Sequence, residues 1–199
     1  PTPNEFEGDW PLHTGDWSVS PGIHPKGLVD VSDAAHAAGM KFLLWFEPER
    51  ARVESAWFKE HPEYFYDRGK DGYGHLLLKL GDKAAWQACH DMLHEHIKTL
   101  KLDCLRIDFN TWPKPFWVDF EEENRVGMNE IAYINGLYRL WDTLLEEFPH
   151  LLIDNCASGG RRIDIETLRR SVPLWRSDYQ CPANYDDYAA QCHTLSFNS

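Results

Sequence analysis

The sequence contains no long run of apolar residues and no cluster of lysine and arginine. Its 199 residues carry a formal net charge of -12, which excludes phosphate neutralisation on a nucleic acid as a main function. No stretch approaches the roughly 18 apolar residues of a membrane span. The five cysteines are odd in number and irregularly spaced, which argues against a disulfide framework and a CxxC zinc site. We expect a soluble chain, cytoplasmic or exported, with neither nucleic acid nor membrane as a partner.

Hydrophobic residues are plentiful, at 43% of the chain, and suffice for one sizeable core. We therefore expect a single domain over residues 1–199. The chain also has nine tryptophans and eight tyrosines, and flat aromatic rings of this kind stack on sugars as well as filling cores. Composition alone gives the sugar-binding interpretation modest support.

Short apolar runs alternate with longer segments of helical periodicity. The predicted strands are 42–46, 104–107, 151–153 and 174–176, and the predicted helices are 31–38, a helix capped by Asp82 and running to Leu100, 131–148, 163–170 and 185–192. Gly39 and Pro149 end two of these helices. Repeated strand and helix units of this kind predict a parallel sheet.

Polar residues follow each predicted strand. Glu47, Asp108, Asp154 and Asp178 all stand just after an apolar run. Since chemistry collects at the carboxyl ends of parallel strands, this pattern favours a (β/α)₈ TIM barrel. A doubly wound sheet is the alternative, but its GxGxxG loop is absent from the sequence. A full barrel needs about 250 residues, so we expect an incomplete fragment of one.

The most informative stretch is Arg106-Ile107-Asp108-Phe109-Asn110. In a strand, Arg106, Asp108 and Asn110 share one face, and a charge buried there needs a partner or a function. We expect Arg106 to attract Asp108 and to favour its ionised form. Asp178 repeats the Arg-x-Asp order after Arg176. Two such aspartates are what a glycoside hydrolase needs.

An ordered set of motifs resembles the family 36 α-galactosidases from about Gly15 to about Asp178. The motifs are Gly15-Asp16-Trp17, Pro25-Lys26-Gly27-Leu28, Gly39-Met40-Lys41-Phe42, Trp45-Phe46-Glu47-Pro48-Glu49, Asp108-Phe109-Asn110, Asn155-Cys156-Ala157-Ser158-Gly159-Gly160, Arg162-Ile163-Asp164 and Trp175-Arg176-Ser177-Asp178. The resemblance implies a (β/α)₈ barrel that hydrolyses terminal α-galactosides of oligosaccharides with retention.

The resemblance also implies residue roles. Asp108 takes the position of the nucleophile and Asp178 that of the acid/base, and substrate contacts are expected at Trp45, Arg106, Asn110, Cys156, Gly159 and Arg162. Arg106 stands where the family has lysine, and Arg161 replaces a glycine. The aspartate pair that binds galactose in the family is expected upstream of Pro1. Glu47 and Glu49 are expected to position other groups.

Each assignment has a structural alternative. Asp108 could be an ion-pair partner of Arg106, Asp178 a helix cap, Cys156 a small buried hydrophobe, Gly159 part of a turn, and Trp45 a core residue. The whole chain could instead act on another α-sugar, transfer galactose to an acceptor sugar, or bind sugar without catalysis. The oligomeric state of the parent protein stays open.

Metal and cofactor sites are not predicted. His90 and His94 are four residues apart on a helix, with His96 nearby, and this spacing suits zinc. There is no HExxH, and the helix precedes its strand, so these histidines are expected to form a solvated or packed face. The predicted reaction needs no cofactor.

Overall fold

The computed structural model describes residues 13–178, and its centre is a parallel sheet. Strands β1 (Leu43–Phe46), β5 (Cys104–Ile107) and β6 (Leu152–Asn155) lie in the order β1-β5-β6. Leu44, Leu105 and Ile153 face one another across the sheet. The predicted parallel strands at these positions are confirmed.

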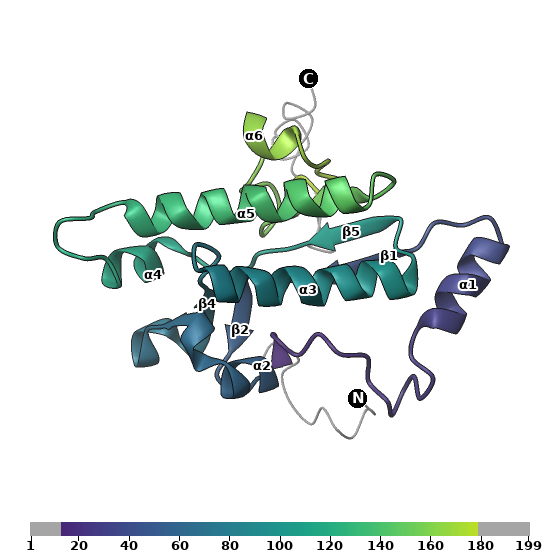
Figure 1. Cartoon of the computed structure of the whole chain (residues 1–199), viewed down its shortest axis with the longest axis horizontal. Helices are drawn as coiled ribbons and strands as arrows, with labels where there is room; N and C mark the ends of the chain where they lie inside the picture. Colours follow the sequence, from purple (N-terminus) through teal and green to yellow (C-terminus); the bar gives the residue numbers. More distant parts are fainter. Residues whose placement is uncertain (1–12, 179–199) are drawn as a thin grey trace, which may run out of the picture.

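Two long helices cover one face of this sheet (Figure 1). Helix α3 (Lys83–Leu100) leads into β5, and α5 (Met128–Glu147) leads into β6. Asp82 caps α3 as predicted, because its carboxylate accepts from the N–H groups of Ala84 and Ala85 at 2.8 and 2.9 Å. The helices meet where the Trp86 indole donates to the carbonyl of Gly136 at 2.9 Å. A shorter helix, α1 (Val29–Ala37), precedes β1.

The two faces of the sheet differ in burial. The helix-covered face carries Leu105, Ile107 and Ile153, all 1% exposed or less. On the opposite face, Leu43 and Leu152 at the edge strands are each 41% exposed. Alternation along each strand separates these two sets. The described strands do not close a barrel, which leaves this second face partly uncovered: Leu43 and Leu152 are exposed, whereas Cys104 and Asp154 on the same face are buried.

A second, antiparallel sheet lies between β1 and α3 in the sequence. Its strands are β2 (Arg50–Arg52), β3 (Phe65–Asp67) and β4 (His75–Leu78), in the order β2-β4-β3. Short helices accompany it: α2 (Ala56–Glu60), η2 (Pro62–Tyr64) and η3 (Gly69–Gly72). Sequence analysis missed this sheet. It holds Arg50 and His75 against the loop that follows β1.

The predicted strand over 174–176 is wrong. Val172 instead forms a single parallel bridge with Asp154, and the chain bends at Leu174. The Leu174 N–H donates to the Asp154 carboxylate at 2.9 Å, so a side chain replaces the strand partner. Helix α6 (Ile165–Leu168) is shorter than predicted, and α4 (Lys114–Asp119) was not predicted. The predicted helix over 185–192 lies outside the described residues. No helix within residues 13–178 is long and apolar enough to cross a membrane.

Candidate active site

Acidic and polar side chains gather where the three parallel strands end. Glu47, Asp108 and Cys156 each follow within a residue of their strand. The pairing continues past the strands, since the Asp108 N–H donates to the Phe46 carbonyl at 2.8 Å and the Cys156 N–H to that of Ile107 at 2.7 Å. The backbone therefore fixes Asp108 and Cys156 side by side.

The Asp108 carboxylate is held by neutral donors. Oδ1 accepts from the N–H groups of Phe109 at 2.8 Å and Ser158 at 3.3 Å, and Oδ2 accepts from the Asn110 amide at 2.8 Å. Burial raises the pKa of Asp108, but the hydrogen bonds from Asn110, Phe109, the Cys156 thiol and Ser158 outweigh it and lower that pKa overall. Asp108 is therefore ionised and half-buried.

A buried ion pair between Glu47 and Arg50 fixes the backbone of Asn110, which in turn orients Asp108. Glu47 is fully buried and binds Arg50 through two hydrogen bonds of 2.7 and 2.6 Å. The Asn110 N–H also donates to Glu47, at 2.5 Å. Because the backbone of Asn110 is fixed in this way, its amide can be directed at Asp108. Glu47 thus positions its neighbours, and its carboxylate is not free for chemistry.

The turn after β6 contacts both predicted catalytic residues. Ser158, in a left-handed conformation with φ of 45°, donates to Asp108 through its N–H and to Asn110 through its hydroxyl at 2.9 Å. A β carbon added to Gly159 would lie 3.4 Å from the carboxyl carbon of Asp178 and 3.0 Å from its nitrogen. Only glycine allows this close approach. Ser158 was not predicted as a site residue, although its place in the Cys-Ala-Ser-Gly-Gly run is a signal for one.

Asp178 lies next to Gly159. Its carboxylate is exposed and accepts from the Trp175 indole at 2.8 Å. Asp108 and Asp178 therefore both contact the turn over residues 156–160. Cys156 is 3% exposed, and burial raises the pKa of its thiol to about 11, so the thiol stays protonated beside Asp108.

The predicted pairing of Arg106 with Asp108 is wrong. Arg106 forms an ion pair with Asp154, its cross-strand neighbour on β6, which is 1% exposed. Trp45 stands opposite Arg106 on β1, half-buried, with its ring 5.9 Å from that of Trp17. Trp45, Arg106 and Asp154 thus form one row on the uncovered face of the sheet, just below the strand ends.

Arg162 lies beneath the turn. Its guanidinium donates to Glu49 at 2.7 Å and to the Cys156 carbonyl at 3.3 Å, and it stacks over the Phe109 ring at 5.0 Å. Glu49 is fully buried and also accepts from the Tyr133 hydroxyl at 2.5 Å. This network holds the turn in place, so the geometry favours a positioning role for Arg162 over contact with a ligand.

The described residues form a parallel α/β unit with carboxylates at the strand ends, the arrangement in which such domains carry out chemistry. Residues 9–189 match the Melibiase family. The chain is 32% identical over 173 residues to an α-galactosidase of Escherichia coli and 29% identical over 168 residues to one of Lactobacillus acidophilus. Each alignment covers 82% of this chain and 23% of the relative. The chain belongs to the Melibiase family and corresponds to a region of the family 36 α-galactosidases.

Solved structures show the same fold. The α-galactosidase from Lactobacillus brevis superimposes with a TM-score of 0.81 at 26% identity, over 96% of this chain and 25% of that one. The family 36 enzyme AgaA from Geobacillus stearothermophilus, in complex with raffinose, gives a TM-score of 0.79 at 22% identity, over 95% of this chain and 26% of that one. The mixed α/β fold thus matches part of a family 36 catalytic domain, and the chain spans about a quarter of its relatives' length.

Proposed function

We propose that the chain is part of the catalytic barrel of a retaining exo-α-galactosidase that hydrolyses terminal α-D-galactosyl residues. The observation that carries this proposal is the environment of Asp108. Its carboxylate lies at a strand end, and hydrogen bonds from neutral donors keep it ionised. The exposed carboxylate of Asp178 lies next to the same glycine turn. A nucleophile of this kind is charged without being neutralised by a bound cation.

In the proposed reaction, Asp108 attacks the anomeric carbon while Asp178 protonates the departing glycosidic oxygen. This forms a covalent glycosyl-aspartate and releases the aglycone. Asp178 then takes a proton from water, which attacks the same carbon from the side opposite Asp108 and frees both the sugar and the carboxylate. Retaining hydrolases hold the two carboxyl groups about 5–5.5 Å apart, and the proposal requires this separation between Asp108 and Asp178 when a sugar is bound. The reaction needs no cofactor.

The remaining predicted residues take roles in binding and positioning. Trp45 and Arg106 line the uncovered face below the strand ends, where a sugar enters. Asn110 orients Asp108, while the Cys156 thiol and Gly159 border the sugar near the nucleophile. Arg162 holds the turn through Glu49 and Cys156.

We further propose that residues 1–199 form part of one (β/α)₈ domain whose other strands lie elsewhere in the parent protein. The uncovered sheet face supports this, because Leu43 and Leu152 would line the interior of a closed barrel. Strand order β1-β5-β6 with helices α3 and α5 on the same face is the local pattern of such a barrel. The substrates are α-galactosides of the raffinose type, as named for AgaA in its raffinose complex.

Replacing the nucleophile tests the function. In the full-length protein, Asp108→Gly should abolish hydrolysis of an aryl α-galactoside, and added azide should restore part of the turnover and yield a galactosyl azide. Asp33→Asn, on α1 and paired with Lys101, serves as the matched control and should keep full activity. A sugar-binding protein without catalysis would show the same ligand affinity in both variants and no turnover in the parent.

The role of Asp178 is tested by leaving groups. Asp178→Ala should slow hydrolysis of a disaccharide far more than that of an activated aryl galactoside, because a good leaving group needs little protonation. Equal losses on both substrates would remove Asp178 from the acid role. Product analysis with an added acceptor sugar separates hydrolysis from galactosyl transfer, and a panel of aryl α-glycosides tests the choice of sugar.

A further inference from the structure

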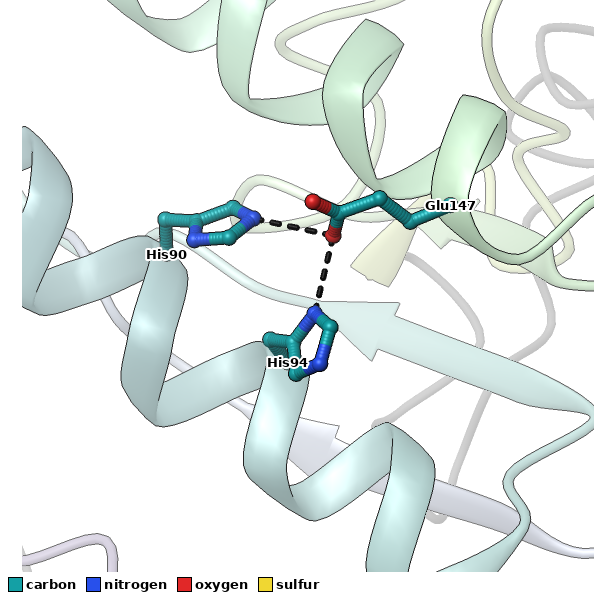
Figure 2. A group of neighbouring side chains, drawn as sticks. All are labelled: His90, His94 and Glu147. Carbon is teal, nitrogen blue, oxygen red and sulfur yellow. Dashed lines mark hydrogen bonds and ion pairs between the residues drawn. The ribbon is translucent and has the colours of Figure 1, made fainter.

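Two histidines of α3 and one glutamate of α5 converge away from the candidate active site. Figure 2 shows both imidazole rings directed at the Glu147 carboxylate. His90 Nε2 lies 3.0 Å and His94 Nδ1 lies 2.9 Å from the same oxygen, Oε2. The three potential ligand atoms are all within 4.8 Å of one another.

Both ring nitrogens of His90 face a carboxylate. The other ring nitrogen, Nδ1, lies 3.0 Å from the carboxylate of Asp91, so an acceptor faces each nitrogen of the ring. A neutral imidazole has one N–H and can satisfy only one of them. The cluster thus favours a positive group between His90 and Glu147, either a proton or a metal cation.

We propose that His90, His94 and Glu147 bind one divalent transition-metal ion, with Zn²⁺ as the best fit. Two imidazoles and a carboxylate, with water in the fourth position, are a common tetrahedral zinc set. Zinc bonds of about 2.0–2.2 Å place neighbouring ligand atoms about 3.4 Å apart, close to the two nitrogen-to-oxygen distances found. Small rotations of His94 and Glu147, which are 33% and 34% exposed, complete the geometry and admit the water.

Neighbouring side chains fix the orientation of the two histidine rings. Trp86 stacks on His90 with ring centroids 5.3 Å apart and an angle of 9°, and Phe148 packs on His94 at 5.0 Å. With zinc bound, His90 Nδ1–H would donate to Asp91, 3.0 Å away, and leave the Nε2 lone pair for the metal, as in other zinc sites where a carboxylate accepts from a ligating histidine. Glu147 closes α5 just before β6, at the end of the sheet opposite Asp108. The ion would therefore join α3 to α5 and stabilise the fold without taking part in hydrolysis.

Zinc binding tests the proposal on the full-length protein after treatment with a chelator. We expect calorimetric titration and equilibrium dialysis to find a zinc equivalent that raises Tm. Glu147→Gln and His94→Gln should each weaken that binding by about 100-fold or more and remove the rise in Tm, while Asp91→Asn should weaken it by about 10- to 100-fold. His61→Gln, which alters a half-exposed histidine that contacts Glu63 and the ring of Tyr64, should bind as the parent does.

Two results would overturn the site. The first is a parent protein that binds no zinc below millimolar concentration, which leaves the cluster as an ion pair. The second is equal binding in the parent and both ligand variants, which places the metal elsewhere in the protein. Tm of each variant in the presence of chelator confirms that it folds. Because no activity is measured, failure of zinc binding leaves the proposed hydrolysis untouched.

Discussion

Asn110→Ala should raise the pKa of Asp108, the proposed nucleophile, while keeping the backbone hydrogen bond of residue 110. The Asn110 amide donates to Asp108 Oδ2 at 2.8 Å, while the Asn110 N–H, which any residue supplies, stays bonded to Glu47. Hydrogen bonds to a charged group contribute about 1.5–3 kcal/mol, and one pKa unit corresponds to about 1.4 kcal/mol. Since Asn110 is exposed and water can replace part of its bond, we take the lower end. The pKa of Asp108 should rise by about one unit.

Two measurements follow this shift. The acid limb of the pH profile of kcat/KM for an aryl α-galactoside should move up by about one unit. NMR titration of the carboxyl carbon of Asp108 should give the same shift without reference to activity. Asn129→Ala is the matched control, because it removes an amide that donates to the Trp117 carbonyl far from Asp108. It should leave both titrations where they are in the parent.

Stability gives an independent check with a defined sign. Folding lowers the pKa of Asp108, so its hydrogen bonds stabilise the fold above the unfolded value near 3.8 and cease to do so as pH falls through the folded value. Asn110→Ala should therefore reduce the free energy of unfolding by about 1 kcal/mol at pH 7 and by little at pH 2. A carboxyl titration and an acid limb that coincide with those of the parent would refute the role of the Asn110 amide in keeping Asp108 ionised.

Two further substitutions test the packing and the second sheet. Gly136→Ala would place a β carbon 2.0 Å from the Leu80 carbonyl oxygen, so the variant should be about 1–3 kcal/mol less stable in urea unfolding. Helix propensity alone would predict a gain of roughly 1 kcal/mol, and such a gain would contradict this contact. Burial, and then the charge of Arg50, lowers the pKa of His75 to about 4. Because the unfolded chain takes up a proton at His75 before the folded protein does, the fold should lose stability as pH drops from 6.5 toward 4. The loss should be less than about 1.4 kcal/mol per pH unit at this partly exposed site. His75→Gln should flatten that slope, and an unchanged slope would assign the loss to other groups.

The long helices α3 and α5 and the strands β1, β5 and β6 were predictable because their patterns are long or repeated. Helix α3 has buried residues at spacings of three and four over 18 residues, and its Asp82 cap is a local signal. The antiparallel sheet gave no such signal, since its strands are three or four residues long and Leu76, Leu77 and Leu78 are all buried. A continuous apolar run of that length fits a strand, a helix turn or a loop equally well. The pairing that decides between them joins residues far apart in the sequence.

The candidate site shows the same division between local and long-range information. Its position at the strand ends followed from the order of strands and polar residues, but the partner of Arg106 did not. Residues two apart along a strand are about 6.6 Å apart, whereas cross-strand neighbours lie about 4.8 Å apart, so register decides which carboxylate Arg106 meets. Asp154 is the nearer and is 1% exposed, and an unpaired charge there would be far more costly than at half-buried Asp108.

The pairing of Arg106 with Asp154, and not with Asp108, alters the chemistry expected of Asp108. Had Arg106 bound it, the carboxylate would have been ionised but held in an ion pair, and attack on a sugar would first have required that pair to break. Instead Arg106 neutralises Asp154, and the donors from Phe109, Ser158 and Asn110 keep Asp108 charged through neutral groups. Such donors lower the pKa while leaving a net negative charge at the strand end, where the positive charge of an oxocarbenium-like transition state would develop in the proposed reaction. The ion pair between Arg106 and Asp154 thus leaves Asp108 unpaired with a cation among the described residues, as the proposed nucleophilic role requires.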